Sequence, residues 1–194
     1  MTFILKSCKI SINFYFFASV VILAMFDRSG MMLGGMISAL LHESGHLAAM
    51  LIIPRQKPKA ISITPFGLKI QNNSMAEFAC GRVIVLAAGS VVNFILAACL
   101  FRLSPQLAAM NLILGFMNLL PVESFDGGGI LKIILNFFMS EKTSEIAVTI
   151  VSLIILTVLA FVGIYILFRT KYNFTLLGMS LWLLITVIIR LAKK

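Results

Sequence analysis

The chain has 194 residues, of which 60% are hydrophobic and 12% carry a charge. That charged fraction is about half of what a soluble domain carries. A soluble domain of this size cannot bury so much apolar surface, so the composition excludes a cytosolic enzyme, a disordered tail and a disulfide-stapled secreted domain. We expect one membrane-embedded domain over residues 1–194, without an appended regulatory module. The formal net charge of +9 indicates orientation in a bilayer and not nucleic-acid binding, because the basic residues lie in short loops beside apolar runs.

Apolar runs dominate the chain, and most are long enough to cross a hydrocarbon core of about 30 Å. Turn and helix-breaking residues such as Pro54, Pro105 and Pro121 separate them. The pattern predicts an all-α integral membrane protein with about six transmembrane helices. The runs cover residues 10–26, 31–53, 82–101, 107–120, 146–168 and 173–192.

The distribution of Lys and Arg predicts the orientation of these helices. If the six runs alternate across the bilayer, four of the sixteen basic residues fall on one side and the remaining twelve fall on the other. The positive-inside rule assigns the side with twelve to the cytoplasm. We therefore expect both termini and the loops 54–81 and 121–145 to be cytoplasmic. The four residues on the opposite side are Arg28, Arg102, Arg169 and Lys171.

Residues 61–70, between the second and third runs, alternate apolar with polar or small side chains on each side of Pro65-Phe66-Gly67. This alternation predicts a short β-hairpin that lies against the membrane. An irregular interfacial loop is the alternative.

The second run contains the sequence His42-Glu43-Ser44-Gly45-His46. Histidines four residues apart share one face of a helix, which suits two ligands of one tetrahedral Zn²⁺. Glu43 follows the first histidine and can act as a general base. Ionisable side chains deep in a bilayer are costly unless they are paired, ligated or hydrated, so we expect a metal site here. A purely structural polar cluster is the alternative.

A catalytic zinc usually has three protein ligands and a water, so a third ligand is needed. Asp126 follows Pro121, which ends the fourth run, and the glycines 127–129 after it allow a tight path back toward the helices. An ordinary Asp-Gly turn is the alternative. Glu123 is a competing carboxylate, for which we expect a solvated position in the loop.

The two motifs together resemble the site-2 proteases, which are intramembrane zinc metalloproteases. The first motif is H-E-x-G-H at residues 42–46, and the second is N-x-x-P-x-x-x-x-D-G at residues 118–127. The resemblance covers about residues 31–130, which we expect to form the catalytic core. It is closest to the branch of stage IV sporulation protein FB, which processes a membrane-tethered sigma-factor precursor in bacteria.

The resemblance implies roles for individual residues. It makes His42, His46 and Asp126 the zinc ligands and Glu43 the general base. Residues 89–93, Gly-Ser-Val-Val-Asn, are similar to the G-P-x-x-N of the family, with Ser90 at the position of the proline. The resemblance implies that Asn93 and Asn118 contact the substrate or transition state. For Asn93, a hydrogen bond to a neighbouring helix is the alternative.

The expected activity is hydrolysis of a peptide bond in or near a transmembrane segment of a membrane-tethered protein, at a site that opens toward the cytoplasm of a bacterial cell. We expect Ile63 and Phe66 of the hairpin to dock an unwound substrate segment by strand pairing. The other partners are the lipid bilayer and regulatory membrane proteins, with no nucleic acid.

Two alternatives to a protease remain. One is a metal-binding protein without hydrolysis, either a zinc transporter or an inactive scaffold homologue. The other is a structural subunit with Gly30-x-x-x-Gly34 as a helix-packing contact.

Overall fold

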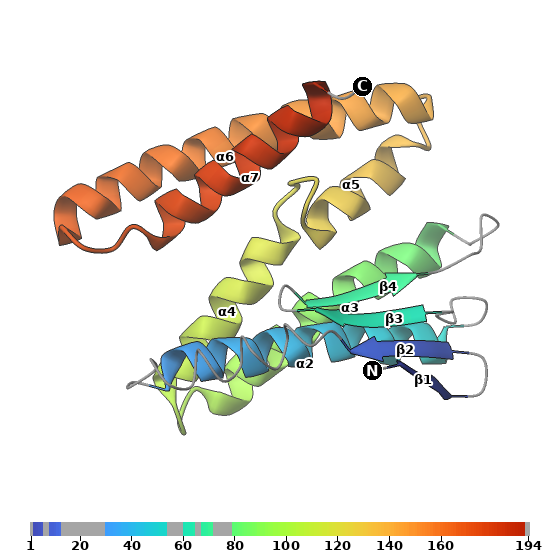
Figure 1. Ribbon diagram of the computed structural model, residues 1–194, viewed down its shortest axis with the longest axis horizontal. Coiled ribbons are helices and arrows are strands. Elements are labelled where there is room, and N and C mark those ends of the chain that lie inside the picture. The colour runs from blue at the N-terminus through green and yellow to red at the C-terminus, as the bar shows by residue number, and fades with distance from the viewer. Residues whose placement is uncertain are drawn as a thin grey trace. The chain divides into compact units, whose positions relative to one another are not determined.

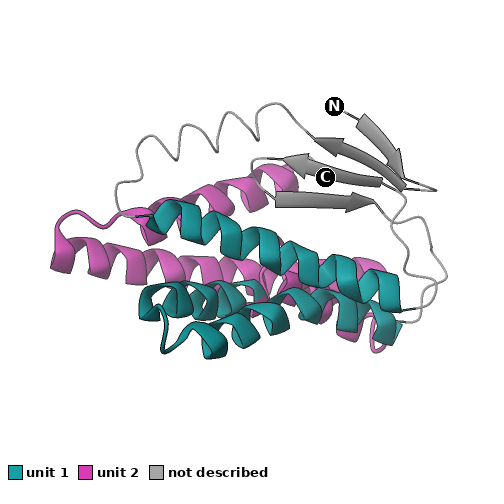
Figure 2. Ribbon diagram, turned by 90° about the horizontal axis from the view of Figure 1, so that it is seen from below, with its two compact units in different colours: residues 1–118 teal, residues 119–194 magenta. Residues whose placement is uncertain are grey.

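The computed structural model describes residues 30–53 and 79–192 in full, together with the backbone of four strands between residues 2 and 71. The chain divides into two units, Met1–Asn118 and Leu119–Lys194, which Figure 2 distinguishes by colour. Each unit is described by itself below.

The helices of the first unit begin and end where the sequence places helix-breaking residues. Helix α2 begins after Gly30, whose φ of 71° is a left-handed conformation that favours glycine. It ends shortly before Pro54, since the residue before a proline disfavours the helical conformation. Helices α2 and α3 pack against each other (Figure 1). The described helices of this unit are α2 (Met31–Ile52), α3 (Ala79–Leu100) and α4 (Pro105–Leu119).

Among the described residues, Gly34 makes a helix contact of the kind expected from the Gly30-x-x-x-Gly34 spacing, and Gly30 does not. A Cβ added to Gly30 would have no atom of the described residues within 4 Å, because this glycine caps the start of α2. A Cβ on Gly34 would collide with the side chain of Leu107 on α4. Of the two glycines, Gly30 therefore serves the start of α2 and Gly34 serves its contact with α4.

Four strands form one sheet in the order β1-β2-β3-β4. The segment for which a hairpin is expected runs as β3 and β4, which pair antiparallel with Thr64 opposite Gly67. The sheet is larger than expected, because β2 pairs parallel with β3 and β1 pairs antiparallel with β2. Strand β4 contacts helix α2. The strands are β1 (Thr2–Leu5), β2 (Cys8–Ile12), β3 (Ala60–Thr64) and β4 (Gly67–Gln71).

The first apolar run, residues 10–26, is expected to be a transmembrane helix. Its first three residues belong instead to β2, where they pair with β3. Residues 13–26 lie outside the described residues.

The second unit contains α5 (Asp126–Leu135), α6 (Glu141–Thr170) and α7 (Thr175–Ala192). Ser140 caps the start of α6 by accepting a hydrogen bond from the backbone N–H of Thr143. Helices α6 and α7 pack against each other, and their buried core includes Val122, Leu156 and Val187. Val122 belongs to the turn before α5, so this core also holds that turn on the helix pair.

Three of the described helices, α3, α6 and α7, are long and apolar enough to cross a membrane, which identifies an integral membrane protein. The count covers the described residues only, and three expected spans are absent from it. Residues 13–26 of the first run lie outside the described residues, and two described helices fall short. Helix α4 has 15 residues and reaches about 22 Å, short of the hydrocarbon thickness. Helix α2 has 22 residues, but two histidines and Glu43 lower its hydropathy. The orientation of the helices and the cytoplasmic termini stay predictions.

Candidate metal centre

His42 and His46 lie on the buried face of α2, as the four-residue spacing predicts. Their Nε2 atoms are 3.1 Å apart, and the two rings stand almost perpendicular to each other. Two nitrogens bound to one tetrahedral zinc at 2.0–2.1 Å would lie about 3.3 Å apart. The pair therefore has the spacing of two ligands that converge on one metal ion.

His46 is oriented by the backbone of the neighbouring helix. Its Nδ1 lies 2.7 Å from the carbonyl oxygen of Val85 on α3. A carbonyl oxygen can only accept, so Nδ1 carries the proton and the lone pair of Nε2 is left for a metal. Such a hydrogen bond from the second ring nitrogen is the usual way in which proteins fix the tautomer of a metal-binding histidine.

Gly89 on α3 provides the space in front of the two rings. A Cβ added there would lie 2.7 Å from Nε2 of His42 and 2.6 Å from Nε2 of His46. Both Nε2 atoms thus face Gly89, and a side chain on any other residue at this position would collide with them. The buried donors and the space beside them fit a small divalent cation.

Glu43 follows His42 on α2 and is partly buried. Its position on α2, next to His42, is the one that the H-E-x-x-H pattern predicts for a general base. The next residue, Ser44, is exposed, and its hydroxyl donates to the carbonyl of Leu41 on the same helix. Ser44 therefore serves the helix and not the site.

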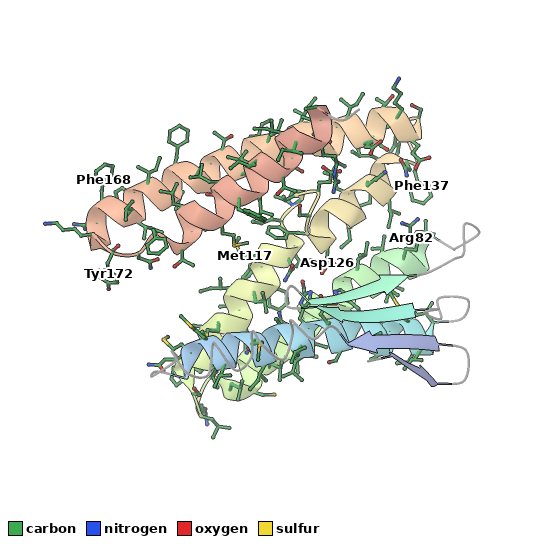
Figure 3. The ribbon with its side chains drawn as sticks, viewed as in Figure 1. Arg82, Met117, Asp126, Phe137, Phe168 and Tyr172 are labelled. Carbon is green, nitrogen blue, oxygen red and sulfur yellow. The ribbon has the colours of Figure 1, made fainter. Side chains whose placement is uncertain are left out.

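Asp126 belongs to the second unit, where it is the first residue of α5 and is partly buried (Figure 3). A carboxylate in the first turn of a helix is favoured by the helix dipole. The glycines after it are required by the turn. A Cβ on Gly127 would overlap the carbonyl of Leu119, and one on Gly128 would overlap the carbonyl of Val122.

Glu123, the competing carboxylate, is not the solvated loop residue that was expected. Its side chain forms an ion pair with Arg190 of α7. Its backbone N–H donates to the hydroxyl of Ser152 on α6, over 2.8 Å. Both contacts fasten the turn before α5 to the helix pair, so Glu123 has a structural function.

The two asparagines assigned to the substrate differ in their surroundings. Asn93 is fully buried on α3, and its Nδ2 lies 3.2 Å from Nδ1 of His42. This contact joins α3 to α2, as the alternative of a hydrogen bond to a neighbouring helix expects, and its partner is a proposed metal ligand. Asn118 donates to the carbonyl of Leu114 on its own helix, α4. Ser90, at the family's proline position, is fully buried within the continuous helix α3.

The two residues expected to dock the substrate are described only in part. Phe66 lies outside the described residues, and Ile63 is described only by its backbone in β3. Strand β3 pairs with β2 on one side and β4 on the other. Ile63 is therefore not on an edge of the described sheet, and strand pairing with a substrate has to use an edge strand.

Sequence reasoning assigned Asn93 of α3 to the site but missed the other contributions of this helix. No role was predicted for the carbonyl of Val85, and none for Gly89 beyond its place in the 89–93 motif. A signal was present, because residues 81, 85, 89, 93 and 97 are spaced by four, and all are buried on one face of α3. Small and polar residues at that spacing in an apolar helix indicate close contact with another helix.

Two comparisons with known proteins found similarity to this chain. Residues 101–162 match the model of peptidase family M50, and this segment contains Asp126 and the second motif. The structure is similar to that of the site-2 protease from Methanocaldococcus jannaschii, with a TM-score of 0.64 and 22% sequence identity, over 96% of this chain and 93% of that one. This similarity shows a shared fold. No curated protein matches the sequence.

Proposed function

We propose that this protein is an intramembrane zinc metalloprotease that hydrolyses a peptide bond in or near a transmembrane segment of a membrane-tethered protein. The observation that carries the proposal is the buried pair His42 and His46, with Nε2 atoms 3.1 Å apart. Ionisable side chains inside a membrane-spanning protein mark functional sites, and this spacing suits two ligands of one shared cation. The matches to family M50 and to the fold of a site-2 protease support the same reaction.

His42, His46 and Asp126 are the residues that would hold the metal. Their nitrogen and carboxylate oxygen donors are those of three-ligand catalytic zinc sites. When bound there, zinc supplies Lewis-acid polarisation of a carbonyl and a water that ionises near neutral pH. Glu123 is the nearest acidic residue in sequence to Asp126, and its ion pair with Arg190 supports Asp126 as the third ligand.

Glu43 is the residue that moves the proton. Its carboxylate accepts a proton from the attacking water and then passes it to the amine nitrogen of the leaving peptide. Water has to reach this residue through the membrane. We place the opening on the cytoplasmic side, together with both termini, because the basic loops predict that orientation.

The substrate helix has to unwind before its backbone can be attacked, since its carbonyls are engaged in i to i−4 hydrogen bonds. An edge strand can stabilise the unwound segment by pairing with it. Strand β4 is at the edge of the described sheet and contacts α2, the helix with the histidines. We therefore assign the docking role to β4. A membrane-tethered sigma-factor precursor, as in the sporulation branch, stays the substrate suggested by the resemblance.

The decisive experiment compares wild-type protein with Glu43→Gln in zinc content and in cleavage of single-pass membrane reporters. We expect Glu43→Gln to retain zinc and to cleave about 10²- to 10⁴-fold more slowly, because general acid–base catalysis contributes that factor. The control is Ser44→Ala, which removes an exposed hydroxyl on the same turn and should leave both quantities unchanged.

Cleavage at the wild-type rate by Glu43→Gln would show that the proposed protease mechanism is wrong. If zinc-loaded wild-type protein cleaves none of a broad panel of reporters, the non-hydrolytic alternative, a transporter or scaffold, takes its place.

A further inference from the structure

The buried side-chain amide of Asn93 on α3 contacts His42, but only one of its two polar atoms has a hydrogen-bond partner among the described residues. Its Nδ2 lies 3.2 Å from Nδ1 of His42, while its Oδ1 has no hydrogen-bond partner among the described residues. The side chain is completely inaccessible to solvent. A buried polar atom without a partner costs about 1–3 kcal/mol, so this arrangement calls for a physical explanation.

With Nδ2 toward the ring, the three side chains form a chain of hydrogen bonds that needs no metal. The amide donates to Nδ1 of His42, whose Nε2–H then faces Nε2 of His46 over 3.1 Å. His46 in turn donates from Nδ1 to the carbonyl of Val85. In this state the proton of His42 is on Nε2, the atom that a metal would need.

A metal ion on both Nε2 atoms requires the other tautomer of His42, with the proton on Nδ1. A proton on Nδ1 needs an acceptor, and the amide nitrogen of Asn93 cannot accept. Rotation of the amide by 180° about its Cβ–Cγ bond exchanges Nδ2 and Oδ1. The oxygen then faces Nδ1–H of His42, in the same way as the carbonyl of Val85 faces His46.

We infer that Asn93 is the positioning residue of the metal ligand His42: in the metal-loaded protein its amide oxygen accepts the Nδ1–H of His42 and keeps Nε2 deprotonated toward the metal. Metal binding thus couples a tautomer change of His42 to a rotation of the Asn93 amide. The inference rests on the proposed metal site but not on hydrolysis, so it can be tested on protein that cannot cleave.

The first test measures zinc affinity, by competition with a chelator, in the Glu43→Gln background. Asn93→Leu keeps the size of the side chain and removes the acceptor, and we expect it to weaken zinc binding about 10- to 100-fold. Asn93→Asp restores an acceptor and should bind zinc within a few-fold of the parent. The matched control is Asn111→Leu. Asn111 is also buried on a helix of this unit, but it donates to the hydroxyl of Ser38 and the carbonyl of Leu107, so its loss should leave zinc affinity unchanged.

The second test is spectroscopic and needs no substitution. The chain has two histidines, so histidine-labelled protein gives a simple ¹⁵N spectrum. We expect His42 to carry its proton on Nε2 without metal and on Nδ1 with zinc, whereas His46 carries its proton on Nδ1 in both states. The Asn93→Leu variant should lose the zinc-dependent change at His42 at zinc concentrations that saturate the parent.

Three results would overturn the inference: unchanged zinc affinity in Asn93→Leu, equal loss of zinc in Asn93→Asp and Asn93→Leu, or a proton on Nε2 of His42 in the zinc-loaded wild type. Unchanged zinc affinity combined with loss of cleavage in the Glu43-containing protein would place Asn93 on the substrate instead. If wild-type protein shows the tautomer change but never cleaves, the proposed function fails and the positioning role stands.

Discussion

Gly45 of α2 and Gly89 of α3 face each other so closely that a Cβ built on Gly45 would lie 3.1 Å from the Cα of Gly89. The same Cβ would lie 2.8 Å from the carbonyl oxygen of Ala88, which is backbone and cannot move aside. This contact brings α3 against the histidine face of α2. The close approach allows Val85 and Asn93 to reach the two imidazole rings.

We predict that Gly89→Ala weakens zinc binding by about 5- to 150-fold. Its methyl group would lie within 2.7 Å of both Nε2 atoms, and forcing an extra methyl into a packed site costs about 1–3 kcal/mol. Chelator competition measures the effect. Gly178→Ala is the matched control, since it lies in α7 with no atom of the described residues within 4 Å of the added Cβ. Wild-type zinc affinity in Gly89→Ala would contradict the proposed position of the metal.

Gly45→Ala should act on folding as well as on zinc. The added methyl meets the backbone of α3, so we expect the two helices to separate, with a loss of about 1–3 kcal/mol in the free energy of unfolding. Thermal unfolding in detergent, with and without zinc, checks this. An unfolding temperature equal to that of the wild type would show that the close packing does not contribute to stability.

The third metal ligand can be identified by comparing two carboxylates of one turn. Asp126→Asn should weaken zinc binding by more than about 100-fold, because loss of a residue that only supports a ligand already costs 10- to 100-fold. Glu123→Gln should bind zinc normally. It breaks the ion pair with Arg190, whose side chain is 54% exposed, and such pairs contribute about 0–1 kcal/mol. The reverse result would make Glu123 the ligand.

Gly127→Ala should disrupt the turn that starts α5. The added methyl would overlap the carbonyl of Leu119. To relieve the overlap, the start of α5 would have to move away from the turn before it. We expect loss of zinc together with lower thermal stability. In the variants of Asp126 and Glu123 stability should fall by less than in Gly127→Ala. Normal zinc content and stability in Gly127→Ala would show that the turn tolerates a wider path.

Substrate docking on β4 predicts an effect of proline that depends on position. Backbone N–H groups of Leu68 and Lys69 point to opposite sides of the strand, one toward β3 and one toward the edge. The proline that removes the outward N–H should slow cleavage about 2- to 10-fold, which corresponds to one hydrogen bond, without loss of zinc. Ile4→Pro on β1, the other edge strand, serves as the control. Equal cleavage by Leu68→Pro, Lys69→Pro and wild type would contradict docking on β4.

The sequence determined much of this protein through local rules. The apolar composition indicated a membrane protein, and Pro54 and Pro105 marked helix boundaries. The spacing of His42 and His46 placed both rings on one face of α2. These features follow from helix geometry and residue chemistry, so the sequence of a short segment is enough to predict them.

Tertiary structure decided what depends on segments far apart in the chain. The pairing of β2 with β3, the ion pair of Glu123 with Arg190 and the contact of Asn93 with His42 each join residues at least 51 positions apart. Periodicity describes one face of one element, and it cannot state which second element covers that face. The contacts of His42 and His46 with Val85 and Asn93 are therefore decided by the packing of α3 against α2.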